Sequence, residues 1–295
     1  MVDYIDDFES YLKEKKNASY NTVVSYVRDV RSFKNFVYEK KLTDIKKSTD
    51  EDVGNYIRYL QEIGKSDSTI TRSIASLKSF FSYLLSKKII QLNPTRSIKP
   101  LKKKKNIPRI LTSEEVNIFL SQPKNDSLKG CRDKAMLELL YATGIRVSEL
   151  ISLDTDDLNT EIGFIRCQKA GGTERIIPLY PVAVSAVADY IKTSRPLLVS
   201  SAEENALFVN VNGKRMTRQG FWKIIKFYQE KAKITTEITP HVLRHSFAVH
   251  LLENGADIGS IKEVMGHSDI SSTNVYAQLI KDKLMTSYMK FHPRA

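Results

Sequence analysis

Cysteine is scarce in this chain of 295 residues, which has only two, Cys131 and Cys167, far apart in the sequence. Disulfide scaffolds and thiolate zinc sites need paired cysteines, so we expect neither, and a reducing cytoplasm is indicated. Long apolar runs are also lacking, because no segment has the about 18 apolar residues of a membrane-spanning helix. Residues 1–7 are acidic and have no apolar core, so we expect no signal peptide.

Two motifs of phosphate chemistry are missing as well. The chain has no glycine-rich loop of the Walker type, which holds the phosphates of a nucleotide. It also has no cluster of carboxylates suited to a pair of divalent metal ions. We therefore expect neither a nucleotide-hydrolysis site nor a two-metal nuclease site.

Negative charge is in short supply relative to positive charge. Lys and Arg number 46 against 34 Asp and Glu, which gives a net charge of +12 and a pI near 9.4. This excess favours a polyanionic partner, with nucleic acid first, although a merely basic soluble protein is the alternative. The length predicts two domains.

The first domain, residues 1–92, is predicted to be an all-α binding module. Apolar side chains recur at three- and four-residue steps, and the polar faces are rich in Lys, Arg, Ser, Thr and Tyr without a candidate catalytic cluster. Thr49 and Asp52 form a variant of the capping box at the start of one helix. The four expected helices span residues 4–15, a segment after Ser19, a segment from Thr49 to Gly64, and a segment from Asp67.

A basic linker is expected at residues 93–110, where prolines keep the chain out of a helix. Such a run is often a solvated loop, but here it joins two folded units of a basic protein. A strap lying along a phosphate backbone is therefore favoured. Its candidate DNA-binding residues are Lys99, Lys102, Lys103, Lys104, Lys105 and Arg109.

The second domain, residues 111–295, is predicted to be helical with a small antiparallel sheet. Two β-type runs, residues 164–167 and 175–179, flank a glycine-bearing turn that carries Lys169. A further short strand is possible at residues 207–209. Helices are expected from the capping box at Thr112, over 132–141, from Ile145, over 182–192 and over 217–233.

The stretch from Thr239 to Tyr276 contains four of the five histidines. Thr239 and Pro240 start a helix that runs to about residue 254, and a second helix spans 258–265. His241 and Arg244 share a face in the first turn, where the helix dipole favours an anion. Arginine, histidine and tyrosine together suggest phosphate chemistry.

The histidines of this stretch have two further interpretations. His241 and His245 are four residues apart, as in a helical metal site, but Val242 stands where a metalloprotease has glutamate. Packing is the favoured role for His245 and for His250, because both lie beside or behind the face that carries Arg244.

Three segments carry a resemblance to a known family. Residues 142–150, Ala-Thr-Gly-Ile-Arg-Val-Ser-Glu-Leu, resemble its first arginine box, and His241-Val-Leu-Arg244 resembles its His-x-x-Arg box. Gly266-His267, with Tyr276 nine residues later, resembles its final box. The chain thus resembles the tyrosine recombinases (the phage-integrase family), most closely the Xer-like members, over nearly its whole length.

The resemblance implies a two-domain, C-shaped DNA clamp that cleaves and rejoins DNA through a 3′-phosphotyrosyl intermediate and a Holliday junction. It implies no cofactor and no metal. Its expected partners are double-stranded DNA with a dif-like or att-like site, a homo- or hetero-tetramer on two sites, and a DNA translocase or second recombinase. The implied catalytic residues are Arg146, Lys169, His241, Arg244, His267 and the nucleophile Tyr276, with Glu149 in support.

The turn that holds Lys169 departs from the family pattern Gly-Lys-Gly-x-Lys-x-Arg. Here it reads Gln-Lys-Ala-Gly-Gly-Thr-Glu-Arg over residues 168–175, with Lys169 as its only lysine. Chromosome dimer resolution fits the compact length. The alternatives are a mobile-element recombinase, a type IB topoisomerase and a non-catalytic DNA-binding regulator.

Overall fold

The computed structural model describes residues 4–39, 44–99, 109–168, 174–201 and 203–266. The chain divides into two compact units, Met1–Asn106 and Ile107–Ala295. Each unit has its own apolar core, and the two cores share no residue. We refer to them as the N-terminal unit and the C-terminal unit.

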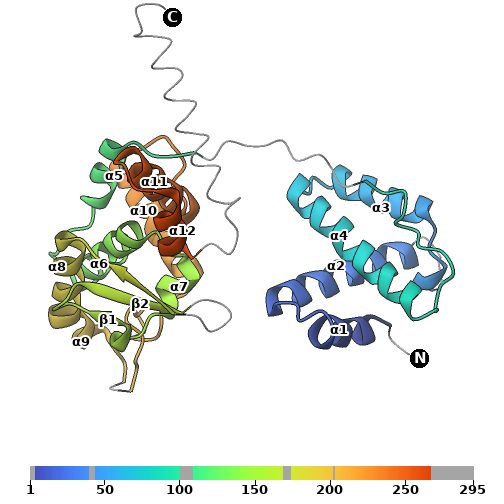
Figure 1. Ribbon diagram of the computed structural model, residues 1–295, viewed down its shortest axis with the longest axis horizontal. Coiled ribbons are helices and arrows are strands. Elements are labelled where there is room, and N and C mark those ends of the chain that lie inside the picture. The colour runs from blue at the N-terminus through green and yellow to red at the C-terminus, as the bar shows by residue number, and fades with distance from the viewer. Residues whose placement is uncertain (1–3, 40–43, 100–108, 169–173, 202, 267–295) are drawn as a thin grey trace, which may run out of the picture. The chain divides into compact units, whose positions relative to one another are not determined.

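The N-terminal unit contains the four predicted helices. They are α1 (Tyr4–Glu14), α2 (Tyr20–Glu39), α3 (Asp50–Glu62) and α4 (Asp67–Ser86), with a short 3-10 turn at Ile45–Lys47 (Figure 1). The capping box of α3 is confirmed, since the Thr49 N–H donates to Asp52 Oδ2 at 2.8 Å and the Asp52 N–H donates to Thr49 Oγ1. The helices meet around aromatic rings, of which Phe33, Phe80 and Phe81 are fully buried.

The C-terminal unit is mainly helical. Its helices are α5 (Ser113–Leu120), α6 (Leu128–Thr143), α7 (Val147–Ser152), α8 (Pro181–Asp189), α9 (Arg195–Leu198), α10 (Arg218–Ala232), α11 (Pro240–Glu253) and α12 (Ile258–Met265). A 3-10 turn lies at Thr155–Asp157 and a π-helical turn at Tyr190–Ser194. Helix α6 is buried on nearly all sides and lies inside this unit (Figure 1), so it is the element on which the others pack.

A three-stranded antiparallel sheet completes the C-terminal unit. Its strands are β1 (Leu158–Asn159), β2 (Phe164–Gln168) and β3 (Glu174–Pro178), in the order β1-β2-β3. The register pairs Cys167 with Arg175 and Gln168 with Glu174. Successive strand residues face opposite sides, so Cys167 and Arg175 are buried on the core face.

The predicted fold class, mainly α with a small antiparallel sheet, is confirmed. The predicted caps Thr49, Thr112 and Thr239 are confirmed for α3, α5 and α11, and α10 and α12 begin within one residue of their predicted starts. The strand suggested at residues 207–209 is wrong, because this buried segment makes only the isolated bridges Asp154–Ala206 and Val209–Arg215. The helix expected over 182–192 instead passes into the π-helical turn and α9. No helix in the described part of the chain is both long and apolar enough to cross a bilayer.

Candidate active site

Arg244 lies in the second turn of α11, and its guanidinium is buried. Its Nη1 donates to the carbonyl oxygen of Gly144, and its Nη2 donates to the carbonyl oxygen of Met265 at 2.6 Å. Gly144 follows the last residue of α6, two residues before Arg146, and Met265 is the last residue of α12. Arg244 therefore links α11 to the end of α6 and to the end of α12 through hydrogen bonds. Helices α11 and α12 lie next to each other in the C-terminal unit (Figure 1).

Gly144 makes this close approach possible. Its φ of +57° lies in the left-handed region, which favours glycine. A Cβ atom added at residue 144 would also overlap the ring of Phe247 on α11. Glycine is thus required both by the backbone and by the packing, and it brings the segment that carries Arg146 against α11.

Arg146 stands at the N-cap of α7 with its side chain about half exposed. Its backbone N–H donates to Glu149 Oε2 at 2.7 Å, and its Nη1 lies 3.6 Å from Glu149 Oε1. The carboxylate of Glu149 thus holds the backbone of Arg146 and lies beside its guanidinium. The backbone of Arg146 is thereby held in place, while its positively charged guanidinium remains at the surface.

Glu149 is ionised at neutral pH. Burial by itself raises the pKa of its carboxyl, but hydrogen bonds from Arg175 and from the backbone N–H of Arg146 outweigh burial. The net result is a pKa below the ordinary value of a glutamate. The predicted supporting residue is therefore a partly buried anion held between two arginines.

Arg175 is a residue that the sequence interpretation did not single out. It lies on β3, is 6% exposed, and its Nη1 donates to Glu149 Oε1 at 2.9 Å. A signal was present in the strand pattern, because Arg175 and Ile177 alternate with Ile176, which is 66% exposed. An arginine in phase with the buried residues of a strand implies a buried acceptor.

His241 and His245 differ in environment although they are one turn apart. His241 is exposed in the first turn of α11, and the two ring centroids are 6.5 Å apart. Burial lowers the pKa of His245 to about 4, and the charges of His241 and Arg244 act in the same direction. His245 is therefore neutral at pH 7, and His241 is the imidazole that an anion at this helix start would meet.

His250 has the packing role predicted for it. Its Nε2 lies 3.0 Å from the carbonyl oxygen of Leu111, which can only accept, so Nε2 carries the proton. Its Nδ1 then accepts from the hydroxyl of Tyr141 at 2.8 Å. His250 thereby joins α11 to α6 and to the start of the C-terminal unit, away from Arg146.

Three predicted site residues, Lys169, His267 and Tyr276, lie outside the described residues. In the described part, Arg244 bonds to the carbonyl oxygens that end α6 and α12, and Glu149 holds the backbone of Arg146 just after α6. His241 lies in the first turn of α11, the helix that also carries Arg244. Two guanidinium groups, an imidazole and the positive end of a helix are suited to bind a phosphate and to stabilise added negative charge on it.

Thiol chemistry and a multidentate metal site find no support among the described residues. Burial raises the pKa of Cys167 to about 12, so its thiol is protonated at neutral pH. Within the part of the chain described, no group of three or more His, Cys, Asp or Glu side chains is placed to hold a metal ion.

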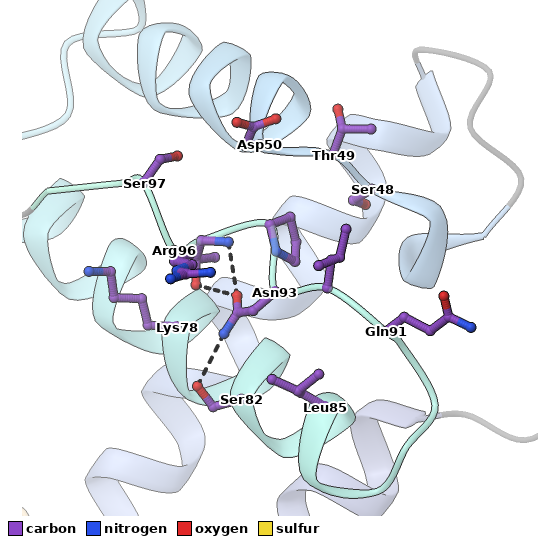
Figure 2. Close-up of a pocket in the computed structure, with 13 residues that line it drawn as sticks. Ser48, Thr49, Asp50, Lys78, Ser82, Leu85, Gln91, Asn93, Arg96 and Ser97 are labelled. Atoms are coloured by element: carbon purple, nitrogen blue, oxygen red, sulfur yellow. Dashed lines mark hydrogen bonds between the residues drawn. The ribbon is translucent and has the colours of Figure 1, made fainter.

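The N-terminal unit has a groove with a volume of about 1110 Å³. It lies between the start of α3, one face of α4 and the segment 91–97, and its charged side chains are Lys78, Arg96 and Asp50 (Figure 2). Asn93 shapes the groove, since its Nδ2 donates to Ser82 Oγ at 3.3 Å and its Oδ1 accepts from the backbone N–H of Thr95.

The basic linker is described only in part. Lys99 and Arg109 are exposed, as expected for residues that contact a partner. The other predicted contacts, Lys102, Lys103, Lys104 and Lys105, lie outside the described residues.

Both units match family models. The model of the phage integrase family matches residues 109–283, and the model of the phage integrase N-terminal SAM-like domain matches residues 5–88. Among curated proteins, the tyrosine recombinase XerD of Oceanobacillus iheyensis is 44% identical over 100% of both chains. That of Staphylococcus epidermidis is 40% identical over 99% of both chains.

Solved structures show the same fold. A XerH site-specific recombinase bound to a palindromic difH substrate has a TM-score of 0.76 at 20% identity, covering 96% of this chain and 83% of that one. A lambda integrase dimer bound to a COC′ core site has a TM-score of 0.73 at 15% identity, covering 92% of this chain and 93% of that one.

Proposed function

The chain belongs to the phage integrase family of tyrosine recombinases, and we propose that it is a Xer-like site-specific DNA recombinase that resolves chromosome dimers. It cleaves and rejoins strands through a 3′-phosphotyrosyl intermediate and a Holliday junction. The observation that carries the proposal is identity of 40–44% to XerD recombinases along the full chain. The position of Arg244, bonded to both the Arg146 segment and the end of α12, supports it.

Tyr276 is the nucleophile of the proposed reaction. Its phenolate oxygen forms a bond to the scissile phosphorus while the bond to the 5′-oxygen breaks, and Lys169 gives that oxygen a proton. Arg146 and Arg244 stabilise the charge that develops on the non-bridging oxygens. Glu149 orients Arg146 through its backbone N–H. His241 and His267 hydrogen-bond the phosphate and assist proton movement at the tyrosine.

Strand exchange reverses these steps on a new partner. The 5′-hydroxyl of the other DNA strand attacks the phosphotyrosine, and the phenol of Tyr276 leaves and recovers its proton. The phosphodiester is conserved as the covalent adduct, so no nucleotide is consumed. The charge stabilisation comes from Arg146, Arg244 and the histidines, so the proposed reaction uses neither a cofactor nor a metal ion.

Both units of the proposed recombinase contact double-stranded DNA at a dif-like site. The C-terminal unit supplies the chemistry, and the N-terminal unit and the basic linker hold the duplex as the other part of a clamp. The cations Lys78 and Arg96 beside this groove and the exposed Lys99 and Arg109 support this role. The active assembly is a tetramer on two sites, helped by a second recombinase or a DNA translocase in the cytoplasm.

A suicide substrate tests the proposal. DNA captured covalently on the protein in cells is sequenced, and a duplex of that site is made with a nick that lets the cleaved end diffuse away. Wild type is expected to accumulate an adduct that resists detergent, Tyr276→Phe none, and the matched control Tyr288→Phe as much as wild type. An adduct that survives in Tyr276→Phe, or tight binding without any adduct in wild type, would contradict the proposal.

A further inference from the structure

Arg175 is a buried cation at the point where three elements of the C-terminal unit meet. Its Nε donates to the carbonyl oxygen of Val264 near the end of α12 at 2.9 Å. Its Nη1 donates to Glu149 Oε1 on α7 at 2.9 Å. The side chain itself comes from β3, the strand that follows residues 169–173. One guanidinium therefore links β3, α7 and α12.

This arrangement is not the one that stability alone would favour. A buried ion pair gains little over well-packed apolar side chains, because both ions lose their hydration. The Nη2 of Arg175 is also buried, and within the described residues it has no hydrogen-bond partner. Arg175 is thus a buried cation with one donor atom, Nη2, unpaired in the described part of the chain. Such a residue indicates that the positions of Glu149 and of the end of α12 matter more than the stability gained from the ion pair.

Gly266 shows how closely Arg175 fixes the end of α12. The φ of Gly266 is +63°, and a Cβ atom there would lie 2.8 Å from Nη1 and 2.9 Å from Cζ of Arg175. The guanidinium cannot move aside freely, because its bonds to Glu149 and Val264 hold it. The backbone of Gly266, from which the chain continues to His267, thus rests against Arg175.

We propose that Arg175 is a positioning residue of the recombination reaction. It holds the Glu149 carboxylate that fixes the backbone of Arg146, and it holds the end of α12 that leads into His267. Arg175 also lies on β3, opposite Cys167 of β2, and Lys169 follows β2 directly in the sequence. The role rests on the proposed function, since it concerns the placement of that reaction's groups.

Two substitutions separate positioning from stability. Arg175→Met keeps most of the apolar stem and removes both hydrogen bonds, so cleavage of the suicide substrate should fall by about 10²-fold, as for a misplaced reacting group. Arg175→Lys keeps the charge but not the planar fork, so it should recover only part of the loss. DNA binding should stay within about twofold in both, because the side chain of Arg175 is buried and does not itself contact the DNA.

The matched control is Arg166→Met, on the neighbouring strand β2. Arg166 is about half exposed and pairs with Asp157 at 3.5 Å on the surface. Among the described residues, its guanidinium bonds to the carbonyl oxygen of Asp156 and pairs with Asp157, and not with Glu149 or α12. Its loss should leave the cleavage rate within about twofold of wild type.

The dependence of the cleavage rate on pH distinguishes positioning from a purely structural role, because loss of stability alone would not shift this dependence. The groups that face Glu149 are Arg146 on α7 and Arg175 and Cys167 on the sheet, and the Cys167 thiol stays protonated. Without Arg175, the pKa of Glu149 rises, so the acidic limb of the cleavage profile moves to higher pH. An evenly lowered profile, with no movement of that limb, contradicts the positioning role.

The deciding experiment measures single-turnover cleavage of the suicide substrate against pH for wild type, Arg175→Met, Arg175→Lys and Arg166→Met, with thermal denaturation of each. Loss of cleavage with retained binding and a shifted acidic limb supports the proposal. Arg175→Met at the wild-type rate overturns it. If Arg175→Met does not fold, Arg175→Lys carries the same test.

Failure of the proposed function is distinguishable from failure of this inference. Wild type that forms no adduct overturns the proposed function. In that case the interaction between Arg175 and Glu149 can still be tested, because titration of the Glu149 carboxyl by 13C NMR in DNA-free protein requires no activity. A pKa of Glu149 unchanged in Arg175→Met overturns the inference by itself.

Discussion

The N-terminal unit packs its helices around aromatic rings, whereas the C-terminal unit packs its elements around buried ions as well as apolar side chains. Among the Asp, Glu, Lys, Arg and His side chains described in the N-terminal unit, Asp29 is the buried one. The C-terminal unit buries both signs of charge, mostly near α6 and α11. Its buried Asp, Glu, Arg and His side chains, among the described residues, are Arg132, Asp133, Glu138, Arg175, Arg244 and His250.

The difference between the two cores corresponds to a difference between the needs of a binding surface and those of a catalytic site. A DNA-binding surface needs exposed positive charge over a stable core, and an aromatic core provides stability without desolvating ions. A catalytic site needs charged groups at fixed positions, and these must be held by buried partners. Arg244, held by the carbonyl oxygens of Gly144 and Met265, is an example of such a fixed charged group.

The largest expected effect on stability lies in the aromatic core. Phe80→Ala removes a fully buried ring that contacts Phe8 and Phe81, and it should cost about 3–5 kcal/mol of unfolding free energy. Hydrogen exchange followed by mass spectrometry on the full chain should localise the loss to the N-terminal unit. The control Ile63→Ala, at a residue 47% exposed, should stay within about 0.5 kcal/mol. A loss shared equally by both units would contradict separate cores.

The next effect is on chemistry. Arg244→Met leaves two carbonyl oxygens without their donor and removes a positive charge from the proposed phosphate site, so cleavage should fall by about 10²–10³-fold. A matched control is Arg195→Met, since Arg195 also donates to backbone carbonyls, at Ala206 and Glu204. That variant should lose thermal stability but keep the cleavage rate of its folded fraction. Equal loss of cleavage in both variants would show that Arg244 is only structural.

A smaller effect is the pH dependence of the unfolding free energy, which should differ between the two units. All five histidines lie in the C-terminal unit, and the pKa of His245 is lowered to about 4, chiefly by burial. The unfolded chain binds a proton near pH 6.5 that folded His245 does not, so stability falls as pH drops from about 6.5 towards 4. The loss should be roughly 1–2 kcal/mol, allowing for screening of a partly exposed ring.

Denaturant unfolding at pH 7 and pH 5 measures this loss, and His245→Gln should remove it. The fall in stability should be confined to the C-terminal unit, because the N-terminal unit has no histidine. An equal pH dependence in wild type and His245→Gln would contradict the assignment.

The smallest effect concerns two ion pairs inside the N-terminal unit. Arg72 and Asp29 lie 2.6 Å apart with Asp29 buried, whereas Arg31 and Asp6 lie 3.2 Å apart and are both mostly exposed. Double-mutant cycles should give a coupling of about 0.5 kcal/mol or less for the exposed pair and a larger one for the buried pair. Equal couplings would mean that burial of Asp29 adds nothing.

The sequence predicted the elements that depend on local signals. Thr49, Thr112 and Thr239 cap their helices as expected, because a cap involves residues only two or three positions apart. The hairpin β2–β3 followed from two β-type runs about a glycine-bearing turn. Strand β1, of two residues, and the π-helical turn at Tyr190–Ser194 were too short to leave a pattern.

The sequence did not reveal how the candidate site is held together. Resemblance to the family proposed roles for Arg146, Glu149 and Arg244, but roles do not specify contacts. The bond from Arg244 to Gly144 spans 100 residues, and the bond from Arg175 to Val264 spans 89. Such contacts depend on how α7, α11, α12 and β3 pack, and no local spacing encodes them.

The most direct test of the central claim identifies the amino acid joined to DNA. The covalent complex on the suicide substrate is digested with protease and nuclease, and the peptide that carries the nucleotide is sequenced by mass spectrometry. The account predicts a 3′-phosphate ester on Tyr276. A nucleotide found on any other residue, or no modified peptide from a substrate that has been cleaved, would contradict it.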